Sequence, residues 1–379
     1  MLKIIEVVRG LGLGGAETLL FRRLKHSIEA GILAPADITV INTYPRQDYY
    51  EKQFRALGVS VLNTKSNSRI LSSIELVRYL GSQGKEAVLV AHSPFPASIV
   101  KAQSACRGAR FPIIEVAHST QYSWLTLSLG LVWNRYADLC IAVSDDVSRA
   151  VTTRGFRRKL VILAGVDQAE MRLWVEGSLD VALGMRESLG VKSSQRLIVA
   201  VGSLVALKGH RFLLDAVAEL RDSNIHAAIV GEGDERASLE QQISRLGLVG
   251  RVHLLGRQAD AWQWAAVADI IAHPSLYEGL PVALMEARVL GIPTVASDVG
   301  GIAQLFDGAS ASRLTAPESS ADLERAIREV LDDLPLFAEE FLTRASGPTR
   351  WDISRYSREF YAALASESIK FASRSQDRN

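Results

Sequence analysis

The 379-residue chain is predicted to form two doubly wound α/β domains, and three observations predict this fold. Short apolar runs alternate with amphipathic stretches along nearly the whole chain, which is typical of parallel sheets covered by helices on both faces. This alternation lapses over roughly 164–194 and then starts again. The length also suits about two domains of roughly 100–200 residues each.

The strand-like runs fall into two groups on either side of this lapse. In the first half they are residues 3–8, 37–42, 59–63, 87–92, 112–118, 139–144 and 159–163. In the second half they are residues 196–202, 226–231, 251–256, 269–275 and 293–297. We therefore expect domains at 1–166 and 192–345 with a linker near 165–192. A closing helix at 351–370 would be marginal in isolation, so it must pack on another element.

The composition, with 48% apolar and 22% charged residues, indicates an ordinary protein with full cores. No apolar run is long enough to span a membrane. The first ten residues lack the basic segment and cleavage site of a signal peptide. Cys106 and Cys140 match no metal or redox spacing and suit a reducing compartment. We therefore expect a cytoplasmic protein.

The charge is distributed unevenly along the chain. Residues 1–165 carry 21 Lys and Arg against 12 Asp and Glu, whereas the remainder is net acidic. A basic half favours a phosphorylated or lipid-linked partner, or peripheral contact with an anionic membrane; alternatively, the charges of the two halves simply balance. The apolar segment 124–136 is interpreted as a core helix, with a lipid-facing helix as the alternative. No nucleic-acid partner is expected.

The glycines of RGLGLGGAETLL (9–20) follow the first apolar run and open a helix. They fit the G-x-G-x-x-G spacing of a dinucleotide-binding turn. However, the second strand ends in Asn42 instead of the acidic residue that binds a nicotinamide ribose. Gly14 and Gly15 instead suit a phosphate, because free amides at a helix start favour an anion that glycine lets approach. The neighbouring Glu17 is also explained as a partner of the helix dipole.

The most informative segment is HPSLYEGLPVALMEA (273–287), in which Glu278 and Glu286 flank the start of a helix near Pro281. Gly279 leaves the preceding amides accessible to an anion. Two carboxylates near a helix start can accept hydrogen bonds from vicinal sugar hydroxyls. The alternative is a pair of surface glutamates favoured by the helix dipole.

Two further glycine-containing junctions lie where strands meet helices. In VGSLVALKGH (201–210), Gly202 ends a strand and Lys208 can offer an ammonium group to a diphosphate. In VGEGDE (230–235), Gly231 and Gly233 suit close approach of a ligand. The order of these junctions along the chain carries more weight than any one of them.

Together, GGAE, VGSLVALKG, GEG, HLLG and the E-x7-E of EGLPVALME resemble the family-4 glycosyltransferases, or glycosyl transferases group 1, over nearly the whole chain. The resemblance implies the GT-B architecture, in which two Rossmann-like domains face each other across a cleft and the closing helix crosses back to the N-terminal domain. It also implies transfer of a hexose-type sugar, with retention of configuration, from a UDP- or GDP-linked donor. The acceptor would be a glycan, a lipid-linked molecule or a small molecule.

The resemblance further implies roles for single residues. Lys208 matches the cation on the donor diphosphate, and Glu278 matches the carboxylate that faces the donor sugar. His118 matches a histidine near the reacting sugar carbon, although a hydrogen-bonded strand-end histidine is the alternative. These three are the expected catalytic residues. The expected donor-binding residues are Gly14, Gly15, Gly202, Ser203, Lys208, Gly231, Gly233, Arg257, Gly279, Leu280, Pro281 and Glu286.

Within this set, Glu286 matches the ribose-binding carboxylate, and Arg257 lies where the family holds the base. Ser203 is a departure, because the family commonly has Arg at this position. Half of the usual Arg/Lys clamp is therefore absent, unless Arg211 or Arg257 replaces it.

No metal or cofactor is expected, because the sequence contains no Asp-x-Asp pair and no Cys/His cluster. Lys208 and backbone amides would then stabilise the leaving diphosphate. Two alternatives remain. A sugar-nucleotide epimerase can share the two-domain architecture, and a non-catalytic sugar-binding protein can share the sugar ligand. A nicotinamide dehydrogenase is disfavoured by Asn42 and by the E-x7-E segment.

Overall fold

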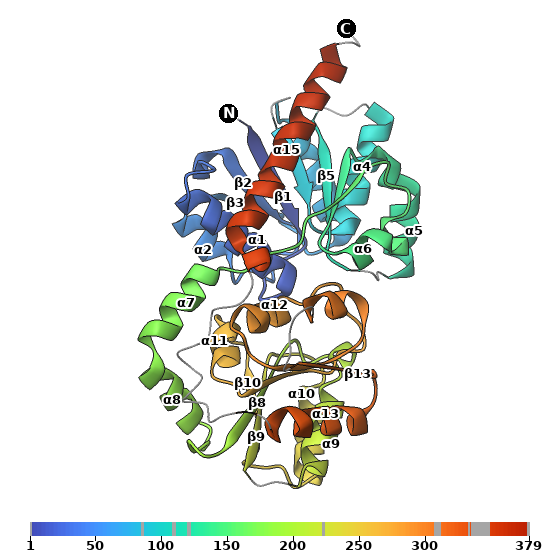
Figure 1. Cartoon of the computed structure of the whole chain (residues 1–379). Coiled ribbons are helices and arrows are strands. Elements are labelled where there is room, and N and C mark those ends of the chain that lie inside the picture. Colours follow the sequence, from blue (N-terminus) through green and yellow to red (C-terminus); the bar gives the residue numbers. More distant parts are fainter. Residues whose placement is uncertain are drawn as a thin grey trace. The chain divides into compact units, whose positions relative to one another are not determined.

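The computed structural model describes residues 2–84, 87–107, 111–119, 123–221, 224–306, 312–332, 334 and 349–376. It divides into two compact units, which are described separately below (Figure 1). Unit 1 comprises Met1–Gly165 and Ile353–Asn379, and unit 2 comprises Val166–Asp352. Each unit is built on a parallel sheet, so the predicted class of two Rossmann-like α/β domains is confirmed. The predicted domain end at 345 lies outside the described residues.

The sheet of unit 1 has the strand order β3-β2-β1-β4-β5-β6-β7, and the described pairings are all parallel. Its strands are β1 (Lys3–Val8), β2 (Ile38–Asn42), β3 (Ser60–Asn63), β4 (Ala87–Ala91), β5 (Ile113–Ala117), β6 (Leu139–Ala142) and β7 (Lys159–Val161). The central strands are buried because helices cover both faces, which explains their continuous apolar sequence.

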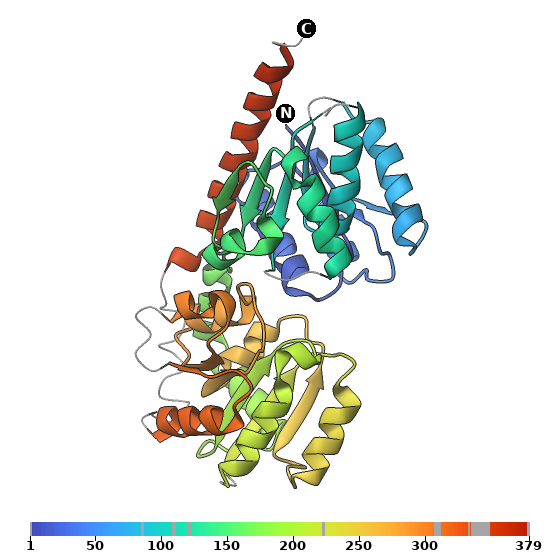
Figure 2. The same cartoon turned by 90° about the vertical axis from the view of Figure 1, so that its right-hand side faces the viewer.

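Figure 2 shows the long α15 on one face of this sheet and α3, α4 and α5 on the other. The helices of unit 1 are α1 (Gly15–Glu29), α2 (Glu51–Ala56), α3 (Arg69–Gly81), α4 (Pro94–Arg107), α5 (Trp124–Trp133), α6 (Asp145–Arg149) and α15 (Ile353–Gln376). Its short 3₁₀ turns are η1 (Pro35–Asp37), η2 (Asn134–Tyr136) and η3 (Val151–Thr153). α15 packs against α1 through a fully buried stripe of Ile353, Tyr356, Phe360 and Leu364. The closing helix thus returns to the first unit, as expected.

The sheet of unit 2 has the order β10-β9-β8-β11-β12-β13. Its strands are β8 (Arg196–Val201), β9 (Ile225–Val230), β10 (Val252–Gly256), β11 (Ile270–His273), β12 (Thr294–Ser297) and β13 (Arg313–Thr315). The chain switches from one side of β8 to the other between β10 and β11. Ligands of open α/β sheets bind at such a switch point, beyond the carboxyl ends of the strands.

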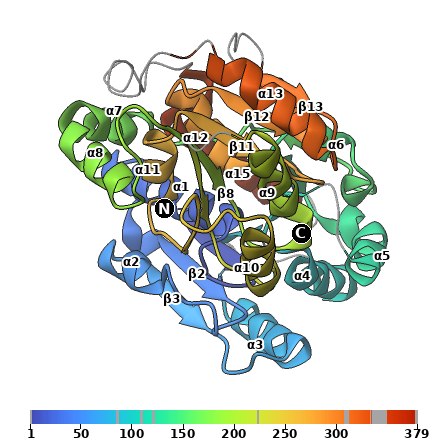
Figure 3. The same ribbon diagram turned by 90° about the horizontal axis from the view of Figure 1, so that it is seen from below.

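Figure 3 shows α9, α10 and α13 on one side of this sheet and α11 and α12 on the other. The helices of unit 2 are α7 (Gln168–Gly177), α8 (Leu179–Glu187), α9 (His210–Glu219), α10 (Arg236–Arg245), α11 (Ala261–Ala266), α12 (Val282–Val289) and α13 (Ser320–Asp332). Its 3₁₀ turns are η4 (Ala206–Lys208), η5 (Gly300–Leu305) and η7 (Thr349–Trp351).

The expected linker at 165–192 is wrong, because α7 and α8 occupy this stretch and belong to unit 2. Asp167 caps α7 by accepting a hydrogen bond from the amide of Glu170. From α8, the buried Arg186 pairs with Asp269 at 2.9 Å, just before β11. These helices are short and amphipathic, so the sequence shows few long apolar runs although the segment is packed.

The interpretation of 124–136 as a core helix is also wrong. α5 packs against α4, but Trp124 is 79% exposed and Val132 is 52% exposed. Leu125 and Leu131 are exposed as well, and Gly130 is the buried residue of this helix. α5 therefore presents an apolar surface outside the core of unit 1.

Candidate active site

In unit 2, the segments that follow β8, β9 and β11 carry most of the residues expected to bind the donor. These strands are neighbours in the sheet, so their carboxyl ends bring the three segments together. The loop after β8 contains Gly202, Ser203 and Lys208, and the loop after β11 leads through Glu278 into α12. The structure thus joins Lys208 and Glu278, which are 70 residues apart in sequence.

Three side chains, those of Lys208, His273 and Ser275, meet at the carboxylate of Glu278. Its Oε1 atom accepts hydrogen bonds from Lys208 Nζ at 2.5 Å and from Ser275 Oγ at 2.8 Å. The same atom lies 2.7 Å from His273 Nε2, and Ser275 Oγ lies 3.1 Å from that nitrogen. These contacts all use Oε1, so none of them occupies Oε2.

The cluster holds Glu278 as a carboxylate. Burial alone would raise its pKa, but the hydrogen bonds and charges of His273 and Lys208 outweigh burial and lower the pKa to about 2. The adjacent His210 is buried at the start of α9, and burial together with His273 lowers its pKa to about 4. At neutral pH the site therefore combines a fixed carboxylate, an ammonium group and a neutral imidazole.

Several glycines shape this site through backbone contacts between neighbouring loops. A Cβ atom on Gly231 would lie 1.9 Å from the carbonyl oxygen of Gly202, and one on Gly233 would lie 2.3 Å from that of Leu204. The loops after β8 and β9 are thus in direct contact at these points. Gly202 itself lies against the side chains of Lys208 and His210, with 3.5 Å from its Cβ position to Lys208 Cδ. Close packing between the two loops therefore explains why positions 231 and 233 are glycines, in addition to the expected close approach of a ligand.

Gly209 offers a sharp test of this packing. It has φ +63°, and its Cβ position lies 2.0 Å from the carbonyl oxygen of Pro274. Gly209→Ala is expected to lower the free energy of unfolding of unit 2 by more than about 2 kcal/mol, since it adds this clash to left-handed strain. The matched control is Gly247→Ala, with φ +68° and open space around its Cβ position. Urea unfolding should show the larger loss for Gly209→Ala, and equal losses would contradict the contact.

Further residues of unit 2 that are expected to bind the donor lie after β8, just before α12 and within α12. Pro281 is the N-cap of α12, and Leu280 beside it is buried. Glu286 is buried within α12. Gly279 accepts a hydrogen bond from the amide of Gly301 at 2.9 Å. Ser203 is exposed on the loop after β8.

Neither arginine named as a replacement for the clamp is shown in contact with Ser203 in the described part of the chain. The guanidinium of Arg211 stacks on its neighbour Phe212, 4.6 Å from the ring centre. Arg257 is exposed beyond β10; Arg236 and, to a smaller degree, Arg257 lower the pKa of Glu232. Lys208 is therefore the cation that the described residues place at Glu278.

In unit 1, Gly14 and Gly15 lie at the start of α1, but the glutamate in its first turn covers this end. A Cβ atom on Gly14 would lie 2.3 Å from Glu17 Oε2. Burial raises the pKa of Glu17, and a hydrogen bond to its own backbone opposes the rise. The carboxyl group thus lies where a phosphate was expected, and an incoming phosphate would have to displace it.

His118 follows β5 and ends a chain of hydrogen bonds that begins at a carboxylate inside β1. Glu6 Oε2 lies 2.7 Å from His92 Nε2, and His92 Nδ1 lies 3.1 Å from His118 Nε2. Glu6 and His92 are buried, and the pKa of Glu6 is lowered because the charges and hydrogen bonds of Arg23 and His92 outweigh burial. An ionised Glu6 can only accept, so His92 donates from Nε2 to Glu6 Oε2.

Burial and neighbouring positive charges set the protonation state of His118. Burial, followed by the charges of His92 and Arg23, lowers the pKa of His118 to about 3. His118 is therefore a neutral imidazole at physiological pH. Its Nε2 is used by the contact with His92, so its Nδ1 is the ring nitrogen left to form a hydrogen bond with a hydroxyl group.

Arg23 connects the same chain of contacts to the C-terminal helix. Its Nη2 donates to Glu6 Oε1 at 2.7 Å, and its Nη1 donates to the Tyr361 hydroxyl at 3.2 Å. The guanidinium lies 3.7 Å from the ring centre of Phe360. Arg23 and Glu6 are both fully buried, so each is the charge partner that the other requires.

Glu6→Gln is expected to lower the free energy of unfolding by about 3–5 kcal/mol, since it leaves Arg23 buried without an opposite charge. Glu29→Gln is the matched control, because Glu29 is exposed at the end of α1. Chemical denaturation of both variants beside the wild type measures the difference. A Glu6→Gln protein as stable as Glu29→Gln would show that this ion pair is dispensable.

The sequence analysis did not select six residues that the structure brings into these contacts: Glu6, Arg23, His92, His210, His273 and Ser275. One signal was available for Glu6, a charged residue within the apolar run KIIEVV of a strand buried on both faces. Among the residues that the structure describes, no group of three or more His, Cys, Asp or Glu could hold a metal ion. None of the described helices is long and apolar enough to cross a bilayer.

Comparison with known proteins identifies the family. Residues 184–342 match the family of glycosyl transferases group 1. The putative glycosyltransferase EpsF of Bacillus subtilis is 25% identical over 320 residues, covering 78% of this chain and 79% of EpsF. The lipopolysaccharide glucosyltransferase WaaG of Escherichia coli is 30% identical over 155 residues, covering 40% of this chain and 41% of WaaG.

A solved structure extends the likeness to the whole fold. Anabaena HepE in complex with UDP-glucose matches with a TM-score of 0.81 and 24% identity, covering 97% of this chain and 100% of that chain. The two Rossmann-like units therefore have the GT-B fold. Residues 184–342 belong to the group 1 glycosyltransferases, and the chain is a glycosyltransferase enzyme.

Proposed function

We propose that the enzyme transfers a hexose-type sugar from a nucleotide-diphosphate sugar to a hydroxyl group of a glycan, a lipid-linked molecule or a small molecule. The observation that carries this proposal is the convergence of Lys208, His273 and Ser275 on Glu278 at the strand ends of unit 2. A UDP-linked donor is favoured over a GDP-linked one, because HepE was solved with UDP-glucose.

The chemistry of donor cleavage assigns a role to the charges of this cluster. Breaking the bond between the sugar and the diphosphate leaves negative charge on the phosphate oxygens. Lys208 and the amides around Gly279 would stabilise this charge as preorganised electrostatics. We propose that no metal takes part, since the positive charge that a metal supplies in other enzymes is provided here by Lys208.

We propose that the reaction retains the configuration of the sugar. The acceptor oxygen would attack the anomeric carbon from the face that the diphosphate leaves, so one carbon–oxygen bond forms as another breaks. The proton of the acceptor hydroxyl would pass to an oxygen of the departing diphosphate. His118, a neutral imidazole at physiological pH, would bind a sugar hydroxyl through Nδ1.

A thermal-shift panel tests the donor. It compares UDP-, GDP-, ADP- and dTDP-sugars with NAD, with EDTA present throughout, because a ligand that binds the folded state raises its stability. Stabilisation by UDP-glucose but not NAD supports the proposal, whereas stabilisation by NAD alone contradicts it. If UDP-glucose stabilises the protein only after Mg²⁺ is added in excess over EDTA, metal independence is contradicted. Conversion of the bound donor to another nucleotide sugar without any acceptor would instead indicate an epimerase.

We also propose peripheral attachment to the cytoplasmic face of a membrane. The proposal rests on the basic first half of the chain and on the exposed apolar side chains of α5. Co-sedimentation with anionic vesicles at low salt should fall in Trp124→Ser. Leu173→Ser is the control, because Leu173 is exposed in unit 2. A wild-type protein that stays in the supernatant would contradict attachment.

A further inference from the structure

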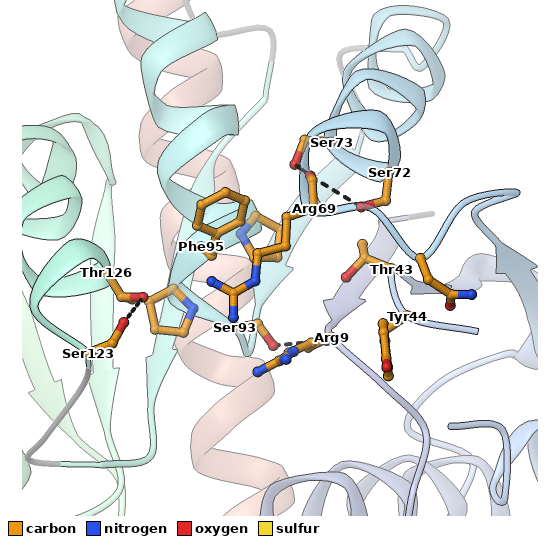
Figure 4. A pocket seen from close by; sticks show the side chains of 13 residues that line it. Arg9, Thr43, Tyr44, Arg69, Ser72, Ser73, Ser93, Phe95, Ser123 and Thr126 are labelled. Carbon is orange, nitrogen blue, oxygen red and sulfur yellow. Dashed lines mark hydrogen bonds between the residues drawn. The ribbon is translucent and has the colours of Figure 1, made fainter. Parts of the chain in front are cut away.

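Unit 1 contains a cavity of about 480 Å³ at the carboxyl ends of its central strands (Figure 4). Thirteen residues line it, from the ends of β1 and β2 and from the starts of α3, α4 and α5. None of these side chains carries a carboxylate, while two of them are arginines. The cavity is thus positively charged.

The two arginines, Arg9 and Arg69, are each held by an aromatic ring. The guanidinium of Arg9 lies 5.7 Å from the ring centre of Tyr44, and that of Arg69 lies 5.6 Å from that of Phe95. Figure 4 shows both guanidinium groups projecting into the same space. Stacking uses the face of a guanidinium and leaves its N–H edge available for hydrogen bonds.

Neither guanidinium has an ion pair or hydrogen bond with another residue in the described part of the chain. Other arginines of this protein are paired, such as Arg23 with Glu6, Arg186 with Asp269 and Arg236 with Glu232. The charge of Arg9 acts on Glu17, whose side chain lies outside the lining of the cavity. Two unpaired guanidinium groups in one cavity match the bidentate geometry of an oxyanion.

The remaining polar lining is rich in hydroxyl groups, which suit a sugar. Ser93 Oγ accepts a hydrogen bond from the amide of Arg9 at 2.9 Å and keeps its proton to donate. Ser123 and Thr126 pair with each other at 2.9 Å, so one of these two hydroxyls also keeps a free donor. Phe95 and Tyr44 supply apolar surface between the polar groups.

We propose that this cavity binds the acceptor as an anionic sugar, whose phosphate or carboxylate group pairs with Arg9 and Arg69. The inference rests on the proposed function and names the acceptor class for it. It places acceptor recognition in unit 1, apart from the Glu278 cluster that we assign to the donor.

Saturation-transfer NMR on the full chain tests the proposal with three probes at millimolar concentration. The probes are glucose 6-phosphate, glucuronate and glucose, and binding of UDP-glucose is measured in parallel. We expect an anionic probe to bind at least about tenfold more tightly than glucose, because a charged hydrogen bond is lost with the neutral sugar. Stronger binding of glucose 6-phosphate indicates a phosphate, and stronger binding of glucuronate indicates a carboxylate.

Variants of the two arginines locate the binding. Arg9→Ala and Arg69→Ala should each weaken the anionic probe by about tenfold or more and leave UDP-glucose binding unchanged. The matched control is Arg78→Ala, because Arg78 is exposed on the same helix as Arg69 and does not line the cavity. All three positions carry side chains outside the core, so thermal melting should confirm that the variants fold.

The outcomes separate this inference from the proposed function. Glucose bound as tightly as the anionic probes, or anionic binding unaffected by Arg9→Ala and Arg69→Ala, overturns the inference. Binding of UDP-glucose without binding of any probe also overturns the inference, but it leaves the proposed function standing. Failure of UDP-glucose to bind overturns the proposed function itself.

Discussion

Replacement of Glu278 by glutamine is expected to lower kcat at least about 100-fold, since electrostatic groups in active sites contribute on this order. The charge of Glu278 holds Lys208 and His273 in one place, because all their contacts meet at Oε1. Glutamine can keep the hydrogen bond from Ser275 but offers no negative charge to Lys208. The measurement is the rate of UDP release from UDP-glucose in the presence of an acceptor.

Two comparisons distinguish a loss of catalysis in Glu278→Gln from a loss of folding. Glu187→Gln is the control for activity, because Glu187 is exposed at the end of α8.

In stability measurements, a lowered pKa means that the carboxylate of Glu278 stabilises the fold above its unfolded pKa of roughly 4.5. This contribution is lost as the pH falls toward about 2, the pKa of Glu278 in the folded protein. The stability difference between wild type and Glu278→Gln should therefore shrink below pH 4.5. Full turnover by Glu278→Gln would contradict its assignment as a catalytic residue.

Lys208→Met should weaken donor binding by about tenfold or more, because a charged hydrogen bond to phosphate contributes about 1.5–3 kcal/mol. It should also lower kcat, since the same charge is needed when the diphosphate leaves. Met preserves most of the side-chain volume against Gly202. Ser203 makes this effect larger, because it is uncharged at the position where the family commonly has an arginine.

The control for Lys208→Met is Lys192→Met, an exposed lysine before β8. Calorimetric titration with UDP separates the two parts of the prediction, because UDP keeps the diphosphate and lacks the sugar. Equal loss of UDP and UDP-glucose affinity would assign Lys208 to the diphosphate. UDP affinity as in Lys192→Met would be inconsistent with that role.

The meeting of Lys208 and Glu278 was predictable from the sequence because its signals are local. HPSLYEGLPVALMEA contains a strand end, a turn and a helix start within 15 residues, and local patterns specify all three. Lys208 belongs to a similar strand-to-helix junction. Two such junctions in one parallel sheet must come together at the same edge, so their meeting follows once the fold class is known.

The Glu6–His92–His118 chain was not predictable in the same way. Glu6 lies in β1, and His92 and His118 follow β4 and β5, so the three side chains meet only because these strands are neighbours in the folded sheet. Arg23 and Tyr361 are 338 residues apart in sequence, so no local pattern connects them. The exposure of α5 was misjudged for a related reason, since an apolar helix does not reveal from its sequence whether another element covers it.

The contacts of α15 also constrain how the protein is made. Domains generally fold in order as the chain leaves the ribosome, but unit 1 needs residues from both ends of the sequence. Until Phe360 and Tyr361 emerge, the guanidinium of Arg23 lacks its aromatic cover, and the Glu6 carboxylate that orients His92 and His118 has an unshielded partner. Translation must therefore be almost complete before His92 and His118 are held in place, so a chain that stops early lacks the contacts that order these two imidazoles.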